Sequence, residues 1–129
     1  MSEPIDLLAL YLHLAMVSQR RQRPLVRDRL LVIAGCNAAR MGLPRIDAYC
    51  RHLILENNPQ HAVGYWPDFA TALEHEDFAL VLRQCQRRYP QEKAESMLAA
   101  LGIQMENERQ AYYSDEEYAA AILGVALDE

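Results

Sequence analysis

Prolines and glycines divide the stretch 25–61 into two helical segments, and their spacing constrains the fold more than any other feature. Pro24 suits the first turn of a helix, because proline lacks the N–H group that a helix start leaves unbonded. Gly42 is suited to end that helix, Pro44 to begin a second one, and Pro59 follows the second. Since the Gly-Leu-Pro joint is short, we expect the two helices to form an antiparallel hairpin.

Apolar residues recur at helical spacing in several segments. In the second helix of the hairpin they are Ile46, Tyr49, Cys50, Leu53 and Ile54. Similar stripes predict helices over residues 69–74, 76–89, 91–101 and 114–127, whereas residues 103–113 form a loop or a frayed helix. Residues 1–129 are therefore predicted to be a single all-α domain, a compact array of six or seven helices in consecutive antiparallel hairpins.

The start of the chain predicts a helix that is buried on most sides. Ser2 can cap it and Pro4 suits its first turn, as Pro67 does for the segment 69–74. Apolar residues cover nearly its whole circumference, so it belongs in the core or in a subunit interface. The interface alternative predicts a homodimer through Leu7, Leu10 and Leu14.

Charge is distributed unevenly along the chain. The formal net charge is −5, which disfavours general binding to nucleic acids. The segment 103–129 holds seven acidic residues against Arg109 alone, a net charge of −6, so residues 1–102 carry +1. It contains Ser114-Asp115-Glu116-Glu117, a capping box in form, with Glu117 placed to reach back to the Ser114 backbone. This acidic segment is either a solvated helix, docked loosely on the body, or a dedicated docking tail.

Cysteine usage and the first apolar run predict a cytoplasmic protein. Cys36, Cys50 and Cys85 are odd in number and widely spaced, which argues against a disulfide framework, and no pair has zinc-ligand spacing. We expect small buried hydrophobes in a reducing compartment, with no metal or cofactor. The run 5–17 is too short to span a bilayer and lacks a preceding positive charge, so no membrane contact is expected.

The hairpin resembles one unit of the tetratricopeptide repeat (TPR) family. Units of that family are antiparallel helix pairs of about 34 residues, with small residues where the helices cross and a proline after the second helix. Here Gly35, Ala38 and Ala48 would be the small positions, and Asn58-Pro59-Gln60-His61 the ending. The resemblance covers residues 25–61 and implies an interaction module that binds a peptide or a helix of a partner protein.

Arginines gather around the first joint of the chain, at Arg20, Arg21, Arg23, Arg27 and Arg29. Guanidinium groups bind phosphate through paired hydrogen bonds, so this cluster is a candidate phosphate- or nucleic-acid-binding patch. Arginine also suits helix C-termini, where it meets the negative end of the helix dipole. Since twelve of the thirteen basic residues are arginines, the alternative is an ordinary charged surface.

A second route to RNA chemistry involves Arg45 and His52, which have six residues between them and share a face of one predicted helix. The pair resembles the arginine–histidine signature of HEPN (higher eukaryotes and prokaryotes nucleotide-binding) ribonucleases. The residue after the arginine is usually polar in that family, and here it is Ile46. The resemblance implies that Arg45 and His52 meet at a dimer interface, where they could polarise a phosphodiester and transfer protons.

Tyr65 and Trp66, in the joint before the segment 69–74, are either an aromatic cover of the core or exposed binding residues. No glycine-rich phosphate loop or paired-carboxylate motif is present, so an enzyme is the weaker hypothesis. The principal expectation is a protein–protein interaction module, TPR-like or homodimerising. The alternative is an RNA- or phosphate-binding protein, or a HEPN-like ribonuclease, that uses the arginine clusters and the pair Arg45 and His52.

Overall fold

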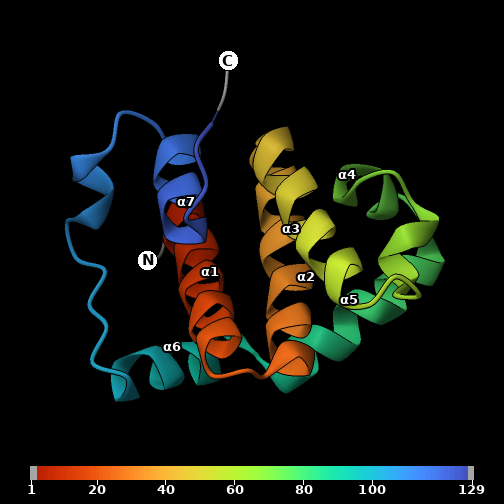
Figure 1. Cartoon of the computed structure of the whole chain (residues 1–129), viewed down its shortest axis with the longest axis horizontal. Coiled ribbons are helices and arrows are strands. Elements are labelled where there is room, and N and C mark those ends of the chain that lie inside the picture. The colour runs from red at the N-terminus through yellow and green to blue at the C-terminus, as the bar shows by residue number, and fades with distance from the viewer. Residues whose placement is uncertain (1–2, 128–129) are drawn as a thin grey trace.

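The computed structural model describes residues 3–127, and over this range the chain is helical without strands (Figure 1). The α-helices are α1 (Pro4–Arg20), α2 (Pro24–Arg40), α3 (Pro44–Asn57), α4 (Phe69–Ala72), α5 (Glu76–Arg88), α6 (Gln91–Ala100) and α7 (Asp115–Leu123). Two short 3-10 helices, η1 (Ala62–Tyr65) and η2 (Glu108–Ala111), lie in the connections. The predicted all-α array of packed helices is confirmed.

Glycines in the left-handed region end three of the helices, with Gly102 after α6 as predicted. Gly42 has a φ of 72°, and the N–H of Leu43 donates to the carbonyl of Ala38 at 2.9 Å. The chain therefore reverses directly from α2 into α3, as the sequence predicts. Gly124, with a φ of 73°, ends α7 at Leu123, which is earlier than predicted.

Two helix starts differ from the sequence prediction. Glu3 is the N-cap of α1, and its backbone N–H donates to the carboxylate of Asp6 at 3.1 Å. Ser2, the predicted cap, lies outside the described residues. Pro67 precedes Asp68, the N-cap of α4, and so is not in the first turn of that helix.

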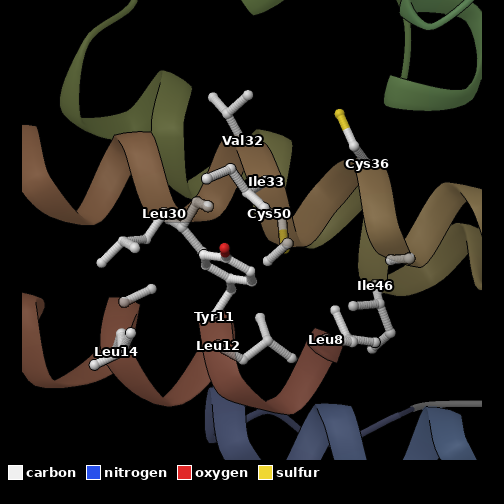
Figure 2. Packing of buried hydrophobic residues seen from close by; sticks show 14 of the residues in the cluster. Leu8, Tyr11, Leu12, Leu14, Leu30, Val32, Ile33, Cys36, Ile46 and Cys50 are labelled. Atoms are coloured by element: carbon white, nitrogen blue, oxygen red, sulfur yellow. The ribbon is translucent and has the colours of Figure 1, made fainter. Parts of the chain in front are cut away.

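The helix α1 is buried on most of its circumference, as predicted. It packs against α2, α6 and α7, and Leu8, Leu12 and Ala15 have no exposed surface. Figure 2 shows Tyr11 projecting from α1 toward helix α2, and the Tyr11 hydroxyl donates to the carbonyl of Tyr89 at 2.7 Å. Although α1 is apolar, no helix within residues 3–127 has both the length and the apolar character needed to cross a bilayer.

The predicted homodimer seam on α1 is corrected by this burial. Leu10 is 3% exposed and Leu14 is 2% exposed, because the chain's own helices cover both side chains. Leu14 therefore leaves almost no surface for a second copy, and Leu10 leaves only a small one. Leu7 is only partly buried and is the most accessible member of the predicted seam.

Three small residues assigned to helix crossings have different surroundings. Ala38 is fully buried, whereas Ala48 is exposed and lies at no crossing. Gly35 accommodates the ring of Phe69 from α4, because a Cβ atom at this position would lie 2.2 Å from the Phe69 Cε2 atom. The small size of residue 35 therefore serves the packing of α4 on α2 and not the crossing of α2 with α3.

The short helix α4 is held in place by a carboxylate from α3. Asp47 is buried and accepts the backbone N–H groups of Phe69 at 2.8 Å and Ala70 at 3.1 Å. Burial raises the pKa of the Asp47 carboxyl, and the two N–H donors act in the opposite direction. The N-cap Asp68 accepts the N–H of Thr71 at 2.7 Å, so the free N–H groups at the start of α4 are satisfied from two sides.

The acidic segment returns to the body of the protein through α7. Ser114 accepts the N–H of Glu117 at 3.1 Å, but the Glu117 carboxylate accepts from Tyr113 and not from Ser114, so the predicted capping box is only half formed. Glu108 of η2 lies between α1 and α7. Its carboxylate accepts the hydroxyl of Tyr118 at 2.9 Å and lies 3.2 Å from the Nε2 atom of His13.

We predict that Gly35→Ala destabilises the protein by about 1–3 kcal/mol, because the new methyl group overlaps the Phe69 ring. This loss outweighs the gain in helix propensity of about 1 kcal/mol that alanine has over glycine. Urea unfolding measures the difference. The matched control is Ala48→Leu at an exposed position of α3. Its free energy of unfolding should stay within about 0.5 kcal/mol of the parent value. A stabilised Gly35→Ala protein would contradict the close packing of Phe69.

Candidate functional site

The predicted arginine patch surrounds the turn between α1 and α2, but its members have different environments. Arg20, Arg21 and Arg23 are exposed. Arg23 and Arg27 line a hollow of about 580 Å³. The other lining residues are Gln19, Gln22, Pro24, Glu56 and Asn57. The hollow thus contains a carboxylate and amide groups as well as guanidinium groups, and it does not have the uniformly basic lining that a phosphate site needs.

Arg27 is part of a buried internal network. Its guanidinium donates to the Asp28 carboxylate at 3.0 Å, to the Leu53 carbonyl at 2.8 Å and to the side chain of Gln19 at 2.8 Å. Asp28 also accepts from the amide of Asn57 at 2.9 Å. Because Asp28 neutralises the guanidinium, Arg27 connects α2 with the last turn of α3 and the end of α1 and is not a free anion-binding group.

The pair Arg45 and His52 is on the exposed side of α3, and each residue has a partner. Arg45 donates to Glu116 of α7 at 2.8 Å, and His52 lies 3.2 Å from Glu56 in its own helix. Their side chains are 53% and 59% exposed. A catalytic role would require the second subunit that the HEPN resemblance implies, so the prediction stays untested.

Of the two neighbouring aromatic residues, Trp66 is packed against the core and Tyr65 is exposed. Trp66 is half-buried, and its ring centroid lies 5.4 Å from that of Phe78 in an edge-on contact. It therefore covers the core, the first of the two predicted roles. Tyr65 is 84% exposed and packs edge-on against Trp66, so this tyrosine stays a candidate binding residue.

Three adjoining hollows lie where α2 and α6 meet α1, and the sequence analysis missed them. Their volumes are about 480, 240 and 160 Å³. Leu7 and Gln91 line all three, and Asn37 lines two of them. We refer to them together as the α1–α2–α6 groove. Their further apolar lining consists of Pro4, Leu10, Ile33, Met41, Leu98, Ala99, Ile103 and Met105.

Two polar features distinguish this groove. Its acidic residues are Glu3, Asp6 and Glu95, against the single base Arg40. The amide nitrogen Nδ2 of Asn37 is buried without a hydrogen-bond partner, alone among the buried side-chain polar atoms of residues 3–127. An unsatisfied buried donor costs about 1–3 kcal/mol, so an acceptor supplied by a ligand would be favourable there.

The three cysteines are buried free thiols, as predicted. Burial raises the pKa of Cys36 to about 12, the pKa of Cys85 to about 11, and the pKa of Cys50 well above its ordinary value. Such thiols are poor nucleophiles at neutral pH. In the part of the chain that the structure describes, no three His, Cys, Asp or Glu side chains converge on a point where a metal ion could bind.

Comparisons with known proteins add no relative: no family model, no curated protein and no solved structure matches this chain. The functional argument therefore rests on the geometry and chemistry of the surface. The sequence had indicated Leu7 only as a dimer contact, and nothing in the local pattern around Asn37 distinguished it from other helical asparagines.

We predict that Arg27→Ala destabilises the protein by about 3–5 kcal/mol, because it leaves the buried Asp28 without its charged partner. Thermal or urea unfolding measures the loss. Arg23→Ala removes a neighbouring exposed arginine and should change stability by no more than about 0.5 kcal/mol. Equal effects of the two substitutions would contradict the structural role of Arg27.

We predict that the native thiols do not react with an aromatic disulfide reagent at pH 8. With a pKa of about 11, the thiolate fraction of Cys85 is about one in a thousand at this pH, and that of Cys36 is smaller still. All three thiols should titrate promptly once the chain is unfolded. As the pH rises, Cys85 should react before Cys36, since the pKa of Cys85 is the lower. Rapid labelling of the folded protein at pH 8 would contradict this burial.

Proposed function

We propose that this protein is an interaction module that binds an amphipathic helical segment of a partner protein in the α1–α2–α6 groove. The observation that carries the proposal is the groove itself, which has an apolar floor, an acidic rim and an unsatisfied amide donor. The three buried free thiols fit the reducing cytoplasm predicted from the sequence.

The apolar floor favours the apolar stripe of an amphipathic helix. Leu7 lines all three hollows, and Leu98 and Met105 contribute further apolar surface to one of them. Burying apolar area contributes roughly 25 cal/mol per Å², so a helix of three or four turns gains most of its binding free energy from this contact. The flexible side chain of Met105 can adapt to the shape of its occupant.

The polar features define the remaining chemistry of the occupant. The carboxylates Glu3, Asp6 and Glu95 favour lysine or arginine residues on either side of the apolar stripe. The Asn37 amide requires an acceptor, which an asparagine, glutamine or serine side chain of the partner can supply. The proposed occupant is therefore a basic amphipathic helix with one polar acceptor in its apolar stripe.

The alternative ribonuclease function has less support. Glu116 binds the guanidinium of Arg45, and the hollow at Arg23 and Arg27 includes Glu56. Neither place offers a set of donors directed at a single phosphodiester.

A display library of random peptides, selected on the full-length protein, tests the interaction module. We expect the enriched peptides to share apolar residues at a spacing of three and four, flanked by lysine or arginine. Ala99→Arg should abolish their binding, because the exposed Ala99 lines the groove and the new side chain adds bulk and positive charge. Leu7→Glu should weaken binding in the same way.

Leu80→Glu is the matched control, since Leu80 is an exposed leucine outside the groove, and it should bind as the parent protein does. Circular dichroism establishes that each variant is folded. The proposal fails if no common pattern is enriched, or if the enriched peptides bind the Ala99→Arg protein as tightly as the parent. It also fails if sedimentation shows that a second copy of the chain occupies the groove.

A further inference from the structure

A second hollow lies between α2, α5 and the loop that precedes η1. Its volume is about 520 Å³, and none of its lining residues is acidic. Arg29 comes from α2, His61 from the loop, and Arg87 and Arg88 from the last turn of α5. The packing of α5 on α2 thus brings together basic residues that are nearly 60 positions apart in the sequence.

The three guanidinium groups of this hollow lack an ion-pair partner within residues 3–127. Arg29, Arg87 and Arg88 form no ion pair or hydrogen bond with any described residue, unlike Arg27 next to Arg29 on the same helix. Asp28, the nearest acid in sequence, is already bound to Arg27 and Asn57. Converging like charges repel one another, so a bound anion would lower the electrostatic energy of the folded protein.

His61 offers the hollow a donor of a different kind. Its Nδ1 atom accepts the N–H of Val63 at 3.1 Å, so the proton of the neutral ring is on Nε2, which has no partner among residues 3–127. Burial lowers the pKa of His61, although the charge of the nearby Asp28 acts in the opposite direction. Because the pKa is lowered overall, the neutral ring is favoured at pH 7.

The lining of the hollow also includes the less polar side chains of Val81 and Cys85. Val81 and the thiol of Cys85 lie on the α5 face that packs toward α2. Burial raises the pKa of Cys85, and the positive charges of Arg29 and Arg88 oppose that rise. Arg29 of α2 and Arg88 of α5 thus line the same hollow from two different helices.

We propose that this hollow binds the phosphate group of a small phosphorylated molecule, with Arg29, Arg87 and Arg88 as charged ligands and His61 as a neutral donor. The planar guanidinium group forms paired hydrogen bonds with phosphate oxygens, and three of them more than neutralise the two negative charges of a phosphate dianion. This inference does not depend on the groove proposed above, because the two sites share no residue.

The shape of the site favours one phosphate group over the backbone of a nucleic acid. The basic residues line a single hollow of limited volume, and they come from two helices and a loop. The overall charge of −5 also opposes the approach of a long polyanion, whereas a small dianion experiences mainly the local field.

Calorimetric titration of the full chain with inorganic phosphate and with glycerol phosphate tests the site, at constant ionic strength in a chloride buffer. We expect saturable binding of both ligands. Arg88→Gln and Arg87→Gln should each weaken binding about tenfold or more, since each removes charged hydrogen bonds to the anion. Arg29→Gln should do the same if the half-buried position tolerates glutamine, and the exposed Arg87 provides the test if it does not.

Arg83→Gln is the matched control, because it removes the same charge from an exposed position of α5. Arg83 does not line the hollow. Its affinity should stay within twofold of the parent. The melting temperature gives a second readout, because specific binding raises it in a saturable way only in proteins with an intact site. The general stabilisation by phosphate as a salt is common to all variants.

Three results would overturn the proposal. The first is that the parent protein shows no saturable binding of either ligand. The second is that Arg83→Gln weakens binding as much as Arg88→Gln does. In the third, a single-stranded RNA oligonucleotide binds with a steep dependence on salt while both monophosphates fail, which would indicate a nucleic-acid surface in place of a phosphate pocket.

Discussion

The helix α1 has apolar side chains around nearly its whole circumference, and the rest of the chain is arranged to exclude water from them. The helix α2 covers one side, and α6 and α7 cover others. Figure 1 shows the segment between α6 and α7 running along the outside of the molecule before α7 returns to α1. The burial of α1 therefore requires both ends of the described chain to lie together, and Glu108 holds them through Tyr118 and His13.

Most helices and several of their ends were predictable because they depend on local chemistry. A proline without an N–H group or a glycine in the left-handed region acts within one turn, so Pro24, Gly42 and Pro44 could be interpreted from the sequence alone. The roles of Arg27 and Asp47 could not. Each depends on a partner 20 or more positions away, such as the Leu53 carbonyl or the Phe69 N–H group, and only packing determines which helix faces meet.

The same limit applies to the candidate sites. The arginines near the first joint form one cluster in the sequence, yet in space Arg27 joins an internal network, Arg23 lines a hollow that includes Glu56, and Arg29 lines a different hollow with Arg88. The groove likewise combines side chains of α1, α2 and α6 that no short motif unites. The packing of the helices thus produces two surfaces of opposite charge, an acidic-rimmed groove and a basic hollow, that share no residue.

The contact between Gly35 and Phe69 has a consequence for the evolutionary history of this chain. The ring of Phe69 fills the space that the missing side chain of Gly35 leaves free. A sequence that acquires a larger residue at position 35 keeps α4 in place only if position 69 becomes smaller in the same lineage. Among descendants of a common ancestor the two positions should therefore vary together, and such paired variation would identify this fold in chains whose remaining residues have diverged.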